Sequence, residues 1–142
     1  MERDVAQKMP LVTRAWRQLA DAALAEFRVS NSMGWCLIWL DRLGPDARQT
    51  DLAQAIGISQ PSTVRVVDQL EVAGLIERLR DPDDKRSNCL SLTERGGELV
   101  TKIEARLAEL RHELFDGIDD AEIETTLSVI NRLQDSIASR RS

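Results

Sequence analysis

The sequence is poor in the residues from which metal and catalytic sites are usually built. It has one histidine, His112, and two cysteines, Cys36 and Cys89, which lie far apart and form no CxxC pair. A structural or sensory metal site and a structural disulfide are therefore not expected. The chain also lacks GxSxG, P-loop, HExxH and GxGxxG patterns, and His112 has no neighbouring nucleophile. We therefore predict neither an enzyme nor a cofactor-binding protein.

Long apolar runs are also absent. No stretch approaches the roughly 18 consecutive apolar residues that a bilayer crossing requires. The first ten residues, MERDVAQKMP, are charged and lack the apolar centre of a secretory signal. A chain of 142 residues that is 42% hydrophobic and 30% charged is typical of one globular domain. We expect a single-domain cytoplasmic protein.

The sequence also lacks an excess of positive charge. The formal net charge is −5, which at first sight argues against a nucleic-acid partner, because phosphate binding is normally supported by a basic surface. The acidity is uneven, however. Residues 1–95 carry 13 basic and 14 acidic side chains, and residues 96–142 carry 6 basic and 10 acidic ones. The first two thirds are close to neutral and can still present a local basic face.

Apolar spacing predicts two helices in the first 45 residues. One amphipathic helix is expected from about residue 5 to residue 28, because apolar residues recur there every three or four positions. Ser30, Asn31 and Ser32 can then cap a second helix. That helix should end at Gly44 and Pro45 and form a hairpin with the first. The apolar positions of the first helix are Met9, Val12, Trp16, Leu19, Ala23 and Phe27.

The stretch QTDLAQAIGISQPSTVRVVDQLEVAGL predicts a helix-turn-helix. Thr50 can cap a short helix, and Gly57 suits the tight turn after it. Ser59 can cap a longer helix that has Pro61 near its first turn and Gly74 at its end. Val64, Val67 and Leu70 are expected in the core. The outward face would carry Gln60, Ser62, Thr63, Arg65, Val66 and Gln69, side chains that suit a reader of the DNA major groove or an ordinary solvated helix face.

A charged hairpin follows this unit. LIERLR and NCLSL alternate apolar and polar residues and can pair as antiparallel strands. Between them, RDPDDKRSN has six charges in nine residues, and Asp81, Pro82, Asp83 and Asp84 favour a turn. A helix-turn-helix followed by a hairpin with Lys85 and Arg86 at its tip is a winged helix. The tip would reach phosphates and a narrow minor groove, or be a solvated loop without a ligand.

These motifs together resemble the MarR family of bacterial transcriptional regulators. The resemblance covers nearly the whole chain, and the stretches AWRQLAD and QPSTVRVVDQLE are most similar to the SlyA-like subgroup. It implies a mainly α fold with a small β-hairpin, an obligate homodimer, a pseudopalindromic DNA operator and, often, a small ligand that weakens DNA binding. Residues 1–142 would form one MarR-type domain, with dimerisation helices at 1–30 and 97–142 around a winged helix-turn-helix at 31–96.

The resemblance also assigns roles to single residues. Ser62 and Arg65 match recognition-helix contacts of the family, and Arg86 matches the arginine that enters the minor groove. Asp84 matches the wing aspartate that holds a nearby arginine in place. Because the reading region is not basic overall, affinity should depend on a few arginines and on dimeric avidity. The full set of expected DNA contacts is Ser59, Gln60, Ser62, Thr63, Arg65, Gln69, Lys85 and Arg86.

Two further helices are predicted after the hairpin. Thr93 can cap a long helix that Gly117 ends, and Asp119 or Asp120 can cap the last one. Both carry apolar stripes with the three-four spacing of a coiled-coil seam. One terminal helix could cover the other, but a second subunit is the better cover, since two recognition helices must lie about one DNA turn apart. The stripes are Val100, Ile103, Leu107, Leu110 and Leu114, and Ile123, Leu127, Ile130, Leu133 and Ile137.

All three tryptophans lie in the first forty residues, on helices expected to join the dimerisation helices to the DNA-binding region. In the family that this chain resembles, phenolic or other aromatic ligands bind at this junction. A site of Trp16, Trp35 and Trp39 with Met33 and Arg17 would suit an aromatic acid whose carboxylate pairs with the arginine. The alternative is that the indole rings are core residues.

Cys36 leaves open an oxidation-sensing regulator, since some relatives sense peroxides through a thiolate. Its flanking residues are apolar, which favours a raised pKa and an unreactive thiol. A winged-helix module that contacts only proteins is a further alternative, which the acidic balance would suit. Binding to DNA that weakens steeply with salt would separate the regulator from that module.

Overall fold

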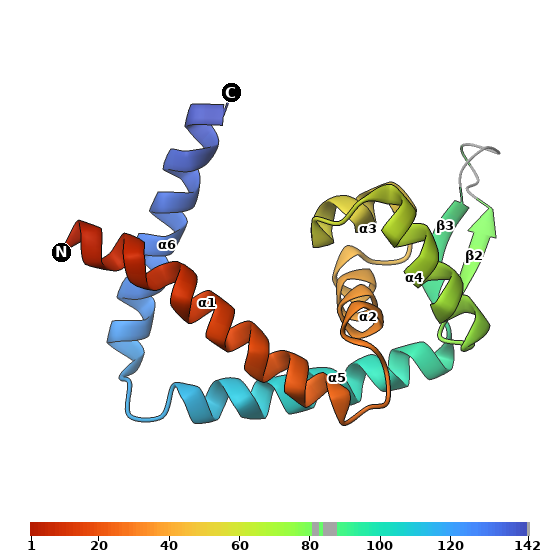
Figure 1. Cartoon of the computed structure of the whole chain (residues 1–142), viewed down its shortest axis with the longest axis horizontal. Coiled ribbons are helices and arrows are strands. Elements are labelled where there is room, and N and C mark those ends of the chain that lie inside the picture. Colours follow the sequence, from red (N-terminus) through yellow and green to blue (C-terminus); the bar gives the residue numbers. More distant parts are fainter. Residues whose placement is uncertain (81–82, 84–87, 142) are drawn as a thin grey trace. The chain divides into compact units, whose positions relative to one another are not determined.

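The computed structural model describes residues 1–80, 83 and 88–141, and of Asn88 only the backbone. Within these residues the chain is mainly helical, with one small sheet (Figure 1). The fold class expected from the sequence is confirmed. The elements in chain order are α1 (Glu2–Ala25), α2 (Asn31–Leu43), β1 (Ala47–Arg48), α3 (Gln49–Ile56), α4 (Gln60–Val72), β2 (Ile76–Arg80), β3 (Asn88–Leu92), α5 (Glu94–Leu114) and α6 (Asp120–Arg141).

The chain forms two compact units, Met1–Glu109 and Leu110–Ser142. The first contains α1 to α4, the sheet and most of α5. The second contains the end of α5 and α6, which are separated by a turn at Gly117, where φ is +80°. No described helix combines the length and the apolar character that crossing a membrane requires.

Side-chain caps at Ser30 and Ser59 set the starts of α2 and α4, as the sequence predicts. The Ser30 hydroxyl accepts a hydrogen bond from the Met33 N–H (3.2 Å), and the Ser59 hydroxyl accepts one from the Ser62 N–H (3.2 Å). The expected cap at Thr50 is wrong, because α3 already begins at Gln49. There the carboxylate of Asp51 accepts the Arg48 N–H at 3.0 Å and satisfies the start of the helix.

The sheet has three antiparallel strands in the order β1-β3-β2. The predicted pairing of β2 with β3 is confirmed, with Ile76 opposite Leu92 and Arg80 opposite Asn88. Strand β1, which places Ala47 opposite Leu90, was not predicted. Two residues are too few to show an alternating pattern, so the sequence carries no signal for it.

Two apolar clusters hold the first unit together. The larger one joins α2, α3, α4, the sheet and α5 around fully buried residues such as Leu37, Leu52 and Val67. The smaller one packs the end of α1 on α2 and α5 around Leu24, Ile38 and Ile103. In Figure 1 the helix-turn-helix and the strands accordingly lie over one end of α5.

The chain crosses itself closely where α4 ends and α5 begins. The Thr93 N–H donates to the Leu75 carbonyl (3.1 Å), and the Thr93 hydroxyl donates to the Gly74 carbonyl (2.7 Å) while it accepts the Gly96 N–H (3.1 Å). A Cβ atom added to Gly96 would lie 1.9 Å from the Leu75 carbonyl oxygen. Only a residue without a side chain therefore fits position 96 at this crossing.

Replacing Gly96 with alanine tests this crossing, and Gly97 offers a matched control. Gly96→Ala should lower the free energy of unfolding by about 2 kcal/mol or more, because backbone must move to admit the methyl group. Gly97→Ala should be neutral or stabilise by up to about 1 kcal/mol, since a Cβ there meets nothing within 4 Å and alanine favours the helix. Urea denaturation measures both. Equal stability of the two variants would contradict the close crossing.

Candidate nucleic-acid interface

Helix α4 has one face in the core and one exposed polar face. Thr63, Val66, Val67 and Leu70 are buried, at the three-four spacing of a packed helix. Gln60, Arg65 and Gln69 are exposed, and Ser62 is partly exposed. Four of the predicted DNA-contact residues of this helix are therefore at least partly open to solvent. Ser59, which caps α4, is also exposed.

The sequence interpretation of α4 was wrong at three positions. Thr63 was expected on the outer face but is fully buried, because its hydroxyl donates to the Ser59 carbonyl (2.9 Å) and so loses no hydrogen bond on burial. Val66 was also expected outside and is only 7% exposed, whereas Val64, expected in the core, is 40% exposed. Because threonine is a polar residue type, Thr63 was expected on the outward face, and the expected exposed face of α4 was therefore rotated by one position.

The structure describes only part of the wing. Strands β2 and β3 lead out of and back into the charged segment, as the sequence predicts. Asp84, Lys85 and Arg86, which carry the predicted wing contacts, lie outside the described residues. Their roles remain predictions from the family resemblance.

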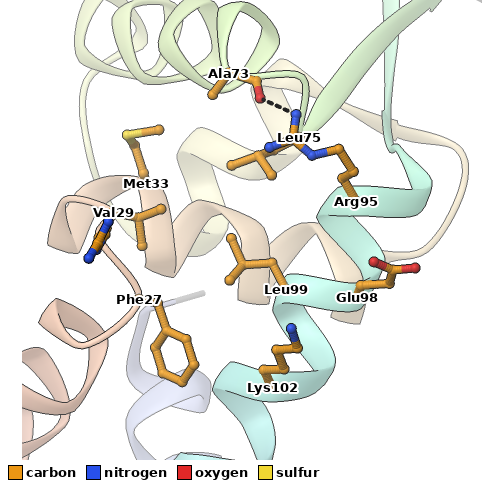
Figure 2. A pocket seen from close by; sticks show the side chains of 10 residues that line it. Phe27, Val29, Met33, Ala73, Leu75, Arg95, Glu98, Leu99 and Lys102 are labelled. Carbon is orange, nitrogen blue, oxygen red and sulfur yellow. Dashed lines mark hydrogen bonds between the residues drawn. The ribbon is translucent and has the colours of Figure 1, made fainter.

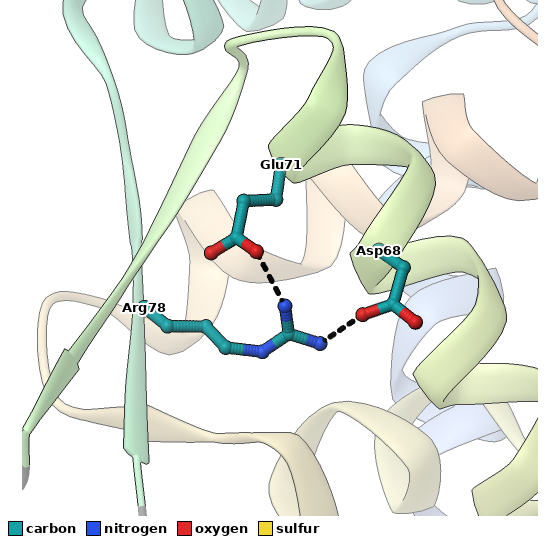
Figure 3. Close-up of polar contacts among 3 residues, drawn as sticks. All are labelled: Asp68, Glu71 and Arg78. Carbon is teal, nitrogen blue, oxygen red and sulfur yellow. Dashed lines mark hydrogen bonds and ion pairs between the residues drawn. The ribbon is translucent and has the colours of Figure 1, made fainter.

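An ion-pair clamp that the sequence did not reveal joins the wing to α4. Arg78 of β2 extends toward α4, where its guanidinium donates to Glu71 (2.7 Å) and to Asp68 (2.5 Å), as Figure 3 shows. Burial alone would lower the pKa of Arg78, but the hydrogen bonds and the charges of Asp68 and Glu71 outweigh it and raise the pKa. The arginine thus stays charged and offsets one of the two negative charges that these carboxylates place on the exposed side of α4.

The tryptophans and Met33 of the predicted ligand site are divided between the two apolar clusters of the first unit. The Trp35 indole N–H donates to Asp21 (2.8 Å), and Arg17 contacts the same carboxylate (3.3 Å) and stacks 3.9 Å from the centroid of the Trp35 ring. Trp16 and Trp35 pack on the smaller cluster. Trp39 and Met33 pack on the larger one. Of the five residues, Met33 lines a cavity of about 410 Å³ (Figure 2).

Cys36 is fully buried, and burial raises the pKa of its thiol to about 12. At neutral pH the thiol is therefore protonated and shielded, which argues against its use as a peroxide sensor. Within the described part of the chain, no three His, Cys, Asp or Glu side chains are arranged to hold a metal ion.

An exposed polar recognition helix, set on a helix-turn-helix and followed by a two-stranded wing, defines a winged-helix protein. A model of the MarR family matches residues 29–87. Transcriptional regulator PA3341 is 30% identical, with a TM-score of 0.85 over 94% of this chain and 98% of that one. The chain belongs to the MarR family.

Two more distant relatives share the fold. MepR from S. aureus, solved in complex with DNA, is 23% identical, with a TM-score of 0.77 over 93% of this chain and 95% of that one. The apo form of MarR from E. coli is 18% identical, with a TM-score of 0.77 over 91% of this chain and 96% of that one.

The Arg78 clamp can be measured by a double-mutant cycle. Arg78→Met should lower the free energy of unfolding at low salt, because the substitution leaves Asp68 and Glu71 without their cation. The loss should be about 1 kcal/mol, since the ion pairs are only partly shielded from solvent. In an Asp68→Asn/Glu71→Gln background the same change should cost much less. High salt should shrink the difference. An equal loss in both backgrounds would mean that Arg78 stabilises the wing by packing alone.

Cysteine labelling tests the state of Cys36. Because its pKa is raised to about 12, the fraction of thiolate at pH 8 is negligible, and iodoacetamide should not modify Cys36 in the folded protein. In urea, with an ordinary thiol pKa, it should react readily. Mass spectrometry of the digested protein reads out each site. Rapid labelling in the native state would reopen the oxidation-sensing alternative.

Proposed function

We propose that this protein is a cytoplasmic, homodimeric repressor that binds a pseudopalindromic DNA operator. The observation that carries the proposal is the exposed face of α4, where Gln60, Ser62, Arg65 and Gln69 stand free of the core. Amide, hydroxyl and guanidinium groups at that spacing match the donors and acceptors of base edges in the major groove. The exposed methyl groups of Val64 add a surface for a thymine methyl.

The wing would supply the second set of contacts. Lys85 and Arg86 are assigned to phosphates and to the minor groove by the family resemblance, with Asp84 orienting the arginine. Support comes from β2 and β3, which hold both ends of that segment in register. MepR, a structural relative, is described in complex with DNA. Assignment to the SlyA-like subgroup within the family rests on the two sequence stretches alone.

A second subunit would cover the apolar side chains that remain exposed at both ends of the chain. In α1, Val12 is 60% exposed, and in α6, Leu127 and Ile137 are 56% and 57% exposed. No residue of α6 is buried. A helix with an apolar stripe and no cover is more often part of an oligomer interface than a free surface. Dimerisation would also set the spacing between two recognition helices.

Release of the operator by a small ligand is part of the proposal. The sequence suggested an aromatic acid at Trp16, Trp35 and Trp39, with Arg17 as its partner. The Asp21 carboxylate already accepts hydrogen bonds from Arg17 and Trp35, so a ligand there would have to displace these contacts. An open cavity beside Met33 offers a site without that cost. Tryptophan quenching by aromatic acids, lost in Trp39→Ala, would favour the tryptophan site.

Arg65 should read a base directly. Operator DNA can be selected with the purified protein from random sequence, and affinity measured by fluorescence anisotropy. Arg65→Ala should cost about 1 to 3 kcal/mol on the selected site and relax preference at one base pair. Arg111→Ala, which removes an exposed arginine from α5, is the charge-matched control and should change neither.

The dependence of DNA affinity on salt concentration distinguishes a DNA-binding regulator from a protein-interaction module. Wild-type affinity should fall steeply with salt, and Arg86→Ala should lower that slope by about one contact, with the greatest loss on A·T-rich flanks. If no DNA is retained at low salt, the chain is a protein-interaction module. If Arg65→Ala discriminates operator from scrambled DNA as well as wild type does, the assignment of α4 is wrong.

A further inference from the structure

Arg65, the residue assigned to base reading, has one carboxylate among its neighbours on α4. Residues three or four positions apart are adjacent on the surface of a helix. For Arg65 these positions hold Asp68, three residues further on, together with Pro61, Ser62 and Gln69. Arg65 and Asp68 are both exposed. An arginine and an aspartate at this spacing on a helix surface attract each other and can form an ion pair.

In the structure, however, Asp68 is bound to a different arginine. Its carboxylate accepts a hydrogen bond from the Arg78 guanidinium (2.5 Å), which also donates to Glu71 (2.7 Å), as Figure 3 shows. Within the described part of the chain, Arg65 makes no ion pair. The guanidinium of Arg65 is thus left for another partner, while the neighbouring carboxylate on its own helix is held by strand β2.

Of the two carboxylates that Arg78 holds, only Asp68 is a neighbour of Arg65. Glu71 is six positions from Arg65, which places it about 120° away around the helix axis. The side chain of Asp68 is 57% exposed. If Arg78 were removed, the Asp68 carboxylate would therefore remain at the surface of α4, within one helical turn of Arg65 and without a cation of its own.

We propose that Arg78 is a positioning residue for DNA reading, which binds Asp68 and thereby keeps Arg65 from pairing with that carboxylate. This inference rests on the proposed function, in which Arg65 contacts a base. The Asp68–Arg78 pair has no net charge, so Arg65 gains little by turning toward it, whereas an unpaired Asp68 would attract Arg65. An arginine held by a carboxylate must give up that bond before it can bind the O6 and N7 acceptors of a guanine.

The size of the effect follows from the strength of an exposed ion pair. A pair at this spacing favours the paired state about twofold. Without Arg78, Arg65 would be free in about one third of the molecules, and operator affinity would fall about threefold for each recognition helix. The two helices of the proposed dimer would multiply the loss to about tenfold. Binding to DNA of scrambled sequence should fall less, because it depends on phosphate contacts and not on a base edge.

Fluorescence anisotropy with the full-length protein tests this role, with operator DNA selected from random sequence and a scrambled duplex of equal length. The quantity measured is the ratio of the two affinities. Arg78→Met should lower this ratio about tenfold. Arg78→Met/Asp68→Asn should restore it to within about twofold of the wild-type value, because no carboxylate is left beside Arg65. Arg78→Met/Glu71→Gln should not restore it.

The two double variants have the same net charge and both lack the clamp, so a loosened wing or a general change of charge would affect them alike. Equal ratios in the two would overturn the proposal, and so would an unchanged ratio in Arg78→Met. In an Arg65→Ala background, Arg78→Met should lower the ratio no further, and a second tenfold loss there would also overturn it.

Two single variants complete the set. Arg111→Met removes an exposed arginine from α5 and should leave the ratio at the wild-type value. Arg78→Gln, which keeps a polar side chain on β2, should reproduce the ratio of Arg78→Met and gives a second test of the same position. Circular dichroism at the assay temperature confirms that each variant is folded. A wild-type ratio in folded Arg78→Gln would contradict the positioning role.

Nuclear magnetic resonance of the Arg65 side chain follows the same exchange of partners without DNA. The Nε–H signal of Arg65, assigned by its loss in Arg65→Ala, should shift in Arg78→Met and return to its wild-type position in Arg78→Met/Asp68→Asn. A signal that does not move in Arg78→Met would overturn the proposal. Failure of the wild-type protein to bind DNA would instead contradict the proposed function, and the resonance data would still decide whether Arg78 keeps Asp68 from Arg65.

Discussion

The close crossing of Leu75 and Gly96 is the constraint on which the arrangement of the first unit depends. Residues 74 and 75 follow the recognition helix, and residues 93 to 96 lead into α5. Thr93 bonds to both carbonyl groups of the first segment, and the absence of a side chain at Gly96 lets the backbones touch. The end of α4 is thereby fixed to the start of α5, which carries the apolar residues that bind α1. An isolated helix-turn-helix would have no such anchor.

The functional elements are arranged around this anchor. Strand β2 leaves it directly, and Arg78, three residues on, reaches back to Asp68 and Glu71 on α4. The wing and the recognition helix are thus held by backbone hydrogen bonds at one end and by an ion-pair clamp beside it. Ala73, Leu75 and Arg95 also line the cavity beside Met33.

The sequence predicted those features that depend on local spacing. Ser30, Ser59, Thr93 and Gly57 marked the helix ends because caps and turns are read from a few neighbouring residues. Alternation in LIERLR and NCLSL predicted the hairpin. The phase of α4 was misjudged because burial of Thr63 depends on a hydrogen bond to Ser59, which residue type does not reveal. Arg78 was missed because its partners Glu71 and Asp68 lie 7 and 10 residues away and meet it only when β2 packs beside α4.

An acidic chain that reads DNA must keep its own carboxylates away from the phosphates. Asp68 and Glu71 stand on the recognition helix itself, where unpaired charges would repel the DNA backbone. Arg78 binds both from the neighbouring strand and offsets one of their two negative charges, and together with Arg65 it brings the summed charge of these four side chains to zero. The acidic surplus of residues 96–142 is carried on α5, on α6 and on the turn between them, beyond the helix-turn-helix in the sequence. The net charge of the whole chain therefore predicts little about this interface, because the local electrostatic potential at α4 depends on which of its carboxylates are paired with a cation.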